Sequence, residues 1–197
     1  MQLTAHGRVL PLRSHPSMER RGLSITRAQR LRLENTLCSL PAHHVSGLSY
    51  VELRQRAGSG GSTNALPGRT SGPGYSIVLD YDSFSRRINQ TTLDLNYTLL
   101  HEMGHVVDWT NHAFSWMQLN DRPGYDAICA RVHRHAPGGT NNDQEKFADA
   151  YADFHFATAR GRRTWPDSIA AIERCRPIWR VPESRPPAGG WGASAYA

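Results

Sequence analysis

Apolar residues recur three and four positions apart in two early stretches of the chain, which is the spacing of an amphipathic helix. The stronger pattern runs over Leu93–Trp109, where leucine, methionine and valine side chains share one face. A second pattern follows Thr26, a residue type that often caps helix N-termini. It predicts a helix that reaches Cys38 and is stopped by Pro41.

The segment between these two helices has the pattern of strands. Leu48–Arg56 alternates apolar and polar residues, and Tyr75–Tyr81 is similarly rich in β-branched and aromatic side chains. Between them, Ala57–Gly74 holds six glycines and two prolines in 18 residues, which predicts a long loop. Such loops often have a function, and a flap over a substrate groove is one. The two strands predict a small, mostly antiparallel sheet.

Further helices are expected over Tyr125–His135, Gln144–Arg160 and Trp165–Cys175. Strands followed by a run of helices indicate an α+β fold, in which the sheet packs against the Leu93–Trp109 helix. The helix over Gln144–Arg160 is expected to pack beside that one.

The two ends of the chain lack periodicity. Residues 1–24 mix Arg, His, Pro and Ser, which predicts a disordered basic arm. The tail over residues 176–197 is rich in proline and glycine and is expected to be irregular. A chain of 197 residues has room for one domain with extensions, and we place that domain at residues 25–175.

Positive charge is concentrated near the N-terminus. Residues 1–32 hold seven arginines and one glutamate and so account for the whole net charge of +6, leaving 16 basic and 16 acidic residues in the rest. A basic arm can contact nucleic acid, an acidic membrane surface or an acidic partner. More often such an arm is a solvated leader with no specific target.

Cysteine usage and hydropathy bear on the compartment. Cys38, Cys129 and Cys175 are odd in number and widely spaced, which is typical of free thiols in a reducing environment. No apolar run approaches the roughly 20 residues that span a bilayer, and the N-terminus has no apolar segment of a cleaved signal peptide. We expect a cytoplasmic protein, or one exported into a host or target cell by an injection system that needs no cleaved signal.

A short motif within the Leu93–Trp109 helix carries chemistry: His101, Glu102 and His105 form a His-Glu-x-x-His run. On a helix, two histidines four residues apart face the same way. Their imidazoles can share one Zn²⁺, and the glutamate between them can reach a water on that metal. The pattern also occurs by chance, but the helical periodicity around it favours a zinc site.

Two histidines do not complete a zinc site, because hydrolytic sites use three protein ligands and a water. Asp108 faces the same way but lies seven residues from His101, about 10 Å along the helix axis, so we expect it near the ligands and not on the metal. His112 comes one residue too late for the long His-Glu-x-x-His-x-x-Gly-x-x-His pattern. The best third ligand is Glu145, near the start of a later predicted helix.

Asp149 follows Glu145 by four residues and therefore faces the same way. Its carboxylate can accept a hydrogen bond from the far nitrogen of a ligand histidine, which fixes the tautomer and the ring orientation. Gly104 and Ala148 are small enough to let the two helices pack closely. Alone, this acidic pair reads as a solvated face near a helix N-terminus; beside the histidine motif it favours a metal site.

His-Glu-x-x-His on one helix and Glu-x-x-x-Asp on a later one is similar to the gluzincin arrangement of thermolysin-like peptidases. The local sequence resembles more closely the anthrax lethal factor catalytic domain and related bacterial toxin-like zincins, over about residues 45–160. The matching residues are His101, Glu102, Gly104, His105, Val107, Asp108, Phe147, Ala148, Asp149, Ala150 and Tyr151. The resemblance implies a zincin-like fold, a Zn²⁺ cofactor, endopeptidase activity on a protein or peptide substrate, and delivery into another cell.

The expected mechanism follows from these residues. Zn²⁺ on His101, His105 and Glu145 lowers the pKa of a bound water from about 15.7 towards 7. Glu102 accepts the proton of that water and later passes it to the leaving amine. Tyr75–Tyr81 is expected to be the edge strand that aligns an extended substrate by backbone pairing.

The residue that steadies the oxyanion is unknown. The lethal factor group has a tyrosine shortly before the third ligand, whereas residues 136–140 here read Ala-Pro-Gly-Gly-Thr. His133, His135, Tyr125 and Tyr151 are all open as donors.

Two other functions stay open. The first is an intracellular regulatory metalloprotease, like the family that relieves phage repressors, with a DNA-binding repressor as its substrate. The second is a non-catalytic binding module that keeps a zincin fold and works through its basic arm. Zinc content together with peptide cleavage separates both from the main interpretation.

Overall fold

The structure, a computed structural model, describes residues 1–55, 61–66, 74–81, 95–130, 143–160 and 170–173. A five-stranded sheet and several helices give an α+β fold, as the sequence predicted. The strands are β1 (Gln2–Ala5), β2 (Arg8–Ser14), β3 (Leu48–Arg54), β4 (Gly61–Ala65) and β5 (Tyr75–Asp80). The helices are α1 (Pro16–Glu19), α2 (Arg27–Cys38), α3 (Ala42–Val45), α5 (Leu95–Asn111), α6 (Ala113–Asn120), α7 (Arg122–Cys129) and α8 (Asp143–Arg160).

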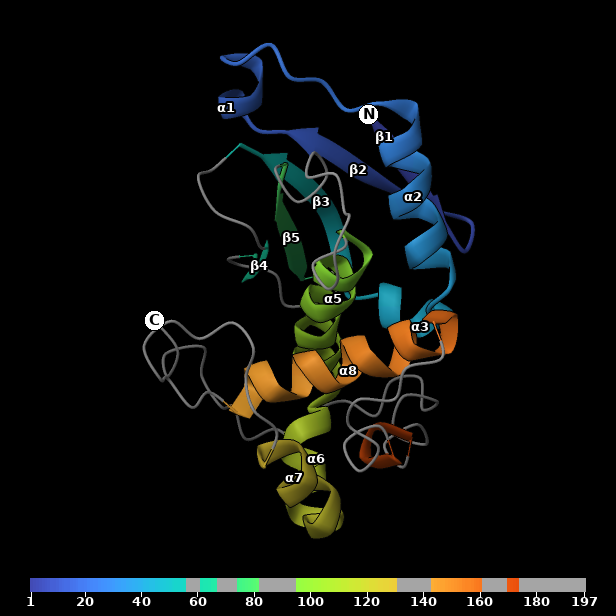
Figure 1. The fold of residues 1–197 in the computed structure, drawn as a ribbon, viewed down its shortest axis with the longest axis vertical. Coiled ribbons are helices and arrows are strands. Elements are labelled where there is room, and N and C mark those ends of the chain that lie inside the picture. Colours follow the sequence, from blue (N-terminus) through green and yellow to red (C-terminus); the bar gives the residue numbers. More distant parts are fainter. Residues whose placement is uncertain (56–60, 67–73, 82–94, 131–142, 161–169, 174–197) are drawn as a thin grey trace.

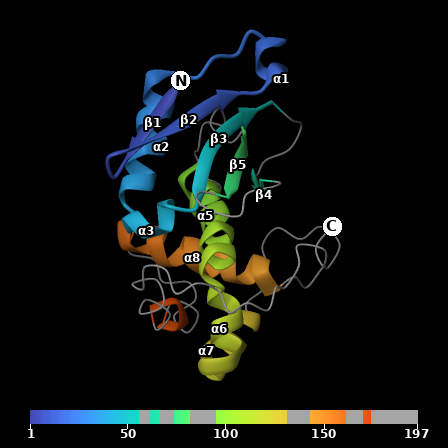
Figure 2. The same ribbon diagram turned by 180° about the vertical axis from the view of Figure 1, so that it is seen from behind.

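The elements form layers (Figures 1 and 2). Helices α2 and α5 lie on one face of the sheet, and α8 crosses α5 on the side away from the sheet. Helices α6 and α7 extend beyond the C-terminal end of α5. None of the described helices combines the length and the apolar character needed to cross a membrane.

The sheet is mixed, with strand order β1-β2-β3-β5-β4, so the prediction of a mostly antiparallel sheet was wrong. β2 pairs in parallel with β3 and β3 with β5, whereas the pairs β1–β2 and β4–β5 are antiparallel. Parallel neighbours require a crossover connection. The connection between β2 and β3 contains helix α2. The strand pattern alone did not predict that these two strands run in the same direction.

The edge of the sheet beside α5 is β4, not the predicted Tyr75–Tyr81 strand. β5 has β3 on one side and β4 on the other. β4 lies inside the Ala57–Gly74 segment that was predicted to be a loop, and it pairs with β5 from Gly61 opposite Leu79 to Ala65 opposite Tyr75. The prediction missed this strand because the segment is rich in glycine and lacks apolar alternation.

The N-terminus forms a hairpin and a short helix, so the predicted disordered arm over residues 1–24 is wrong. His6 and Gly7 have positive φ angles of 50° and 75°, as a tight two-residue hairpin requires. Leu3, Leu10 and Leu12 are buried. Each strand contributes so few apolar residues that the arginines around them hid the alternation. The domain therefore includes residues 1–24.

Several predicted elements are confirmed. Thr26 caps α2 in a capping box, in which its hydroxyl accepts the N–H of Gln29 and the Gln29 side chain accepts the N–H of Thr26. β3, β5, α5 and α8 match their predicted segments. Helix α7 begins three residues before the predicted Tyr125 start and ends at Cys129 with Ala130 as its C-cap, so the predicted extent to His135 was too long. Residues 170–173 are helical within the predicted last helix; Cys175 and the tail over 176–197 lie outside the described residues.

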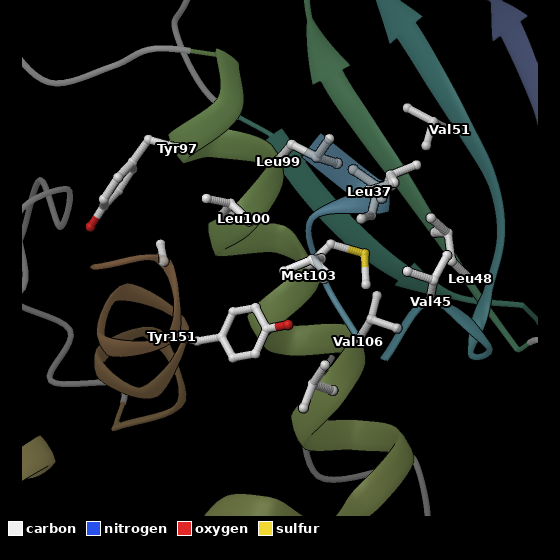
Figure 3. Close-up of a cluster of buried hydrophobic side chains, with 14 of the residues drawn as sticks. Leu37, Val45, Leu48, Val51, Tyr97, Leu99, Leu100, Met103, Val106 and Tyr151 are labelled. Carbon is white, nitrogen blue, oxygen red and sulfur yellow. The ribbon is translucent and has the colours of Figure 1, made fainter. Parts of the chain in front are cut away.

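One hydrophobic core joins the sheet to α5 (Figure 3). Leu99, Met103 and Val106 of α5 are fully buried, at the spacing that the sequence predicted. They meet Val51 of β3 and Leu37 of α2 in the same cluster. Burying one face of α5 in this way fixes where its remaining faces point, towards α8 and towards β4.

Candidate metal centre

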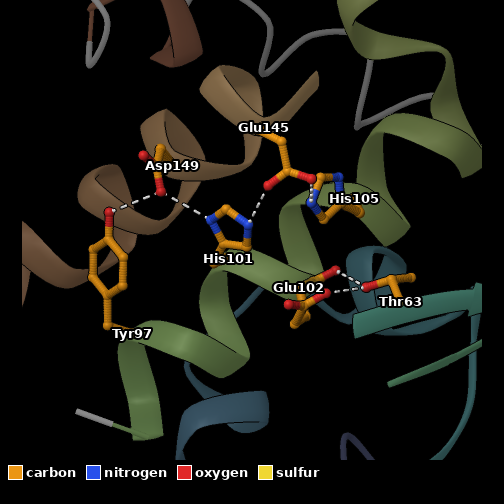
Figure 4. Close-up of polar contacts among 7 residues, drawn as sticks. All are labelled: Thr63, Tyr97, His101, Glu102, His105, Glu145 and Asp149. Atoms are coloured by element: carbon orange, nitrogen blue, oxygen red, sulfur yellow. Dashed lines mark hydrogen bonds and ion pairs between the residues drawn. The ribbon is translucent and has the colours of Figure 1, made fainter. Parts of the chain in front are cut away.

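Three side chains from two helices converge where α5 and α8 cross. His101 and His105 project from α5, and Glu145 projects from the first turn of α8 (Figure 4). The carboxylate oxygens of Glu145 lie 3.1 Å from Nε2 of His101 and 3.4 Å from Nε2 of His105. One ligand atom from each residue lies within 4.8 Å of the others. The structure thus brings together the three residues that the sequence predicted as metal ligands.

Close contact between the two helix backbones makes this convergence possible. A Cβ placed on Gly104 would lie 2.7 Å from Cα of Ala148, a separation that real Cβ atoms do not show. The predicted role of Gly104 in close helix packing is confirmed. This close packing explains a glycine inside a helix, where it costs about 1 kcal/mol relative to alanine.

Asp149 and Tyr97 hold His101 from the far side of its ring. Nδ1 of His101 lies 2.9 Å from Oδ1 of Asp149, whose side chain is fully buried. The Tyr97 hydroxyl donates to the same oxygen at 3.4 Å. When Nδ1–H donates to Asp149, Nε2 is the nitrogen that faces Glu145 and is free to bind a metal. The predicted contact between Asp149 and a ligand histidine is therefore present.

The electrostatics of the site favour a cation between its donors. Burial disfavours a charged imidazole, but the hydrogen bonds that His101 donates to Asp149 and Glu145 outweigh it and raise the pKa of His101 to about 10. Burial would likewise raise the pKa of Glu145, but the hydrogen bonds with His101 and His105 hold it well below its ordinary value. In the metal-free chain, a proton on His101 thus supplies the positive charge beside the Asp149 and Glu145 carboxylates. Two imidazole nitrogens and a carboxylate fit a divalent metal ion of the borderline-soft kind.

Glu102 points towards β4 and not towards α8 (Figure 4). It is 5% exposed, and its Oε2 accepts a hydrogen bond from the Thr63 hydroxyl at 2.7 Å. The same hydroxyl lies 3.0 Å from the backbone carbonyl oxygen of Glu102. Gly61 contacts the Glu102 side chain from the same strand. The group between the two histidines is therefore held by the edge of the sheet.

Asp108 has a structural contact with the next helix. Its Oδ1 accepts the N–H of Phe114 at 2.7 Å, after the chain turns at His112 with a left-handed φ of 52°. Burial raises the pKa of Asp108 to about 6, against the hydrogen bond from Phe114 and the charge of His105. The helix continues unbroken through Asp108, and the group of three donors contains Glu145 instead.

Two of the four candidate oxyanion donors lie in the described residues, and each has a hydrogen-bond partner. The Tyr151 hydroxyl is paired at 2.7 Å with Nδ1 of His44 in a buried contact, which commits it to α3. The Tyr125 hydroxyl donates to Asp143, two residues before Glu145, at 3.4 Å. His133 and His135 lie outside the described residues.

Sequence reasoning missed Tyr97, Thr63 and Gly61. Tyr97 carries a usable signal, because it precedes His101 by four residues and so lies on the same helix face. Thr63 and Gly61 carry none, since they lie in a segment read as a loop and meet Glu102 across some 40 positions.

Comparison of the chain with protein-family models, with curated proteins and with solved structures gives no match. The site must therefore be interpreted from its own geometry.

Proposed function

We propose that this chain is a zinc-dependent endopeptidase of the gluzincin type, built on a zincin-like fold. One observation carries the proposal: two imidazoles and a carboxylate converge from two helices, and a glutamate lies between the two histidines in the sequence. The resemblance of the two motifs to the lethal factor group supports it.

Zinc is the metal that this donor set favours. Two histidines and one glutamate form the protein ligands of known hydrolytic zinc sites, which keep a fourth position for water. His101, His105 and Glu145 would hold the ion, and Asp149 would keep His101 in the tautomer that presents Nε2. A bound zinc ion supplies Lewis-acid chemistry that lets water act as a nucleophile near neutral pH.

Glu102 is the proposed general base and acid. Its carboxylate accepts a proton from the attacking water and then donates it to the amine nitrogen that leaves. Because Glu102 is 5% exposed, its carboxylate forms few hydrogen bonds with bulk water. Thr63 occupies one of its oxygens and leaves other acceptor positions of the carboxylate for the reacting proton.

The edge strand beside this carboxylate is β4, and we assign it the role of aligning substrate. An extended peptide can add to a free sheet edge through backbone hydrogen bonds. β4 is the last strand of the described sheet and contacts Glu102 directly. A peptide paired with it would lie alongside the proposed base, which suits an endopeptidase.

The test combines metal content with cleavage. We expect one zinc ion per purified chain by elemental analysis, and hydrolysis within sequences of a proteome-derived peptide library. Glu102→Gln should keep the zinc and lose cleavage. A protein that neither contains zinc nor takes it up at neutral pH would refute the proposal. Bound zinc without cleavage would favour the binding module, and cleavage confined to one DNA-binding repressor would favour the regulatory protease.

A further inference from the structure

Two residues of β4 contact Glu102 from the same strand face. Gly61 and Thr63 are two positions apart, so their Cα–Cβ directions point to the same side of the sheet. The Thr63 hydroxyl lies 2.7 Å from Oε2 of Glu102. A Cβ on Gly61 would lie 2.8 Å from both Cγ and Oε1 of the same side chain. One strand face thus meets both oxygens of a single carboxylate.

The hydrogen bond from Thr63 to Glu102 belongs to the stronger class, in which the acceptor is charged. A hydroxyl has a single hydrogen to donate, and a hydrogen bond to a charged carboxylate is about twice as strong as one between neutral groups. Between the two acceptors within reach, Oε2 at 2.7 Å and the backbone carbonyl at 3.0 Å, the carboxylate is the nearer and the charged one. The hydrogen of Thr63 therefore fixes the direction of the carboxylate.

Gly61 explains why the carboxylate can reach that position. Any larger residue would place its Cβ 2.8 Å from Cγ and Oε1 of Glu102, closer than real Cβ atoms approach. The three nearest atoms all belong to the Glu102 side chain, so we expect Glu102 to move and the strand to stay. The missing side chain of Gly61 leaves room for the Glu102 carboxylate, and the Thr63 hydroxyl fixes its orientation.

We propose that Thr63 is a positioning residue for Glu102, acting from the strand that aligns the substrate, with Gly61 as its necessary neighbour. The inference deepens the proposed peptidase function and rests on it for its catalytic meaning. It links the substrate-binding edge to the proton-transfer group through one hydrogen bond. Thr63 acts through the Glu102 carboxylate, which its hydroxyl contacts.

The first test is structural and needs no activity. Crystal structures of the zinc-loaded wild type, Thr63→Val and Thr63→Ser would locate the Glu102 carboxylate. Valine keeps the shape of threonine and removes the hydroxyl, whereas serine keeps the hydroxyl. We expect the carboxylate to rotate or to split between conformers in Thr63→Val, and to return in Thr63→Ser. An unmoved carboxylate in Thr63→Val would overturn the inference, even if the wild type proved to have no peptidase activity.

The second test is kinetic. Thr63→Val should lower kcat by roughly 10- to 100-fold, the equivalent of one hydrogen bond to a charged group, while KM changes by less than about threefold and zinc content is unchanged. Thr63→Ser should restore most of kcat. Thr4→Val makes the same chemical change at an exposed position of β1, the opposite edge strand, and should leave kcat unchanged. Equal kcat for Thr63→Val and wild type contradicts the inference; absence of cleavage by the wild type contradicts the proposed function instead.

Discussion

The two sides of helix α5 hold their functional residues in different ways. On the side facing α8, the backbones of the two helices touch: the missing Cβ of Gly104 would lie 2.7 Å from a backbone carbon of Ala148. On the side facing β4, the atoms nearest to the missing Cβ of Gly61 are side-chain atoms of Glu102, at 2.8 to 3.0 Å. The metal ligands depend on the first contact and the proposed base on the second.

This difference predicts that the proposed metal binding and the proposed proton transfer are separable. A backbone contact inside a packed core has little room to adjust, so the positions of His101 and Glu145 follow the packing of whole helices. A side-chain contact can change without moving the fold. Substitutions on the α8 side should therefore alter metal affinity, whereas substitutions on the β4 side should alter turnover at constant metal content.

The largest expected effect comes from removing a ligand on the α8 side. Glu145→Ala removes a carboxylate whose oxygens lie 3.1 Å and 3.4 Å from the two imidazoles. We expect zinc affinity to fall by well over the 10–100-fold that is typical when an outer partner of a ligand is lost. Competition with a chromophoric chelator measures it, with circular dichroism to confirm folding.

Asp149→Asn is the matched control, because it keeps the shape of the residue behind His101 and removes its charge. Its loss of affinity should stay within about 10–100-fold. If Glu145→Ala binds zinc as tightly as the wild type and Asp108→Asn does not, the third ligand has been assigned to the wrong residue.

A smaller effect concerns pH on the same side. The raised pKa of His101, about 10, means that the metal-free site keeps this proton throughout the neutral range. Zinc binds only the neutral imidazole, so the metal must displace the proton. Apparent zinc affinity should rise by about tenfold per pH unit between pH 7 and pH 9, measured with chelator-buffered zinc. In Asp149→Asn the protonated His101 loses its charged partner, so its pKa should fall. The zinc affinity of this variant should then depend less steeply on pH. An affinity independent of pH in the wild type would show that His101 is already neutral.

The sequence predicted the α8 side of α5 much better than the β4 side, because the two sides are formed by different kinds of contact. α5 and α8 are long and periodic, and their ligands repeat at helical spacing, so the α8 side was predicted almost completely, including Gly104. The β4 side was not. A five-residue strand of small and polar residues has no apolar alternation, and it forms because β5 offers a partner.

The N-terminal hairpin escaped prediction for a related reason. Its turn at His6 and Gly7 and its few buried leucines are local features among many arginines. What makes the segment a part of the sheet is the parallel pairing of β2 with β3, some 40 residues away. The arginine-rich composition reflects the exposed side chains of this segment and does not reveal the leucines that it buries.

The smallest expected effects come from two glycine substitutions that test the comparison itself. In Gly104→Ala, relief of the helical glycine would stabilise the fold by up to about 1 kcal/mol, but overpacking against a backbone atom costs typically 1–3 kcal/mol. The cost is expected to win, lowering both the free energy of unfolding and the zinc affinity. In Gly61→Ala the new methyl group would lie 2.8 Å from side-chain atoms of Glu102, so the free energy of unfolding should fall by less than in Gly104→Ala, with zinc retained and kcat reduced. Urea unfolding, chelator competition and peptide cleavage on the two variants give the three readouts. Should Gly61→Ala lose zinc, or Gly104→Ala keep full stability and affinity, the two sides of α5 would not be independent, and the separation of metal binding from proton transfer would fail.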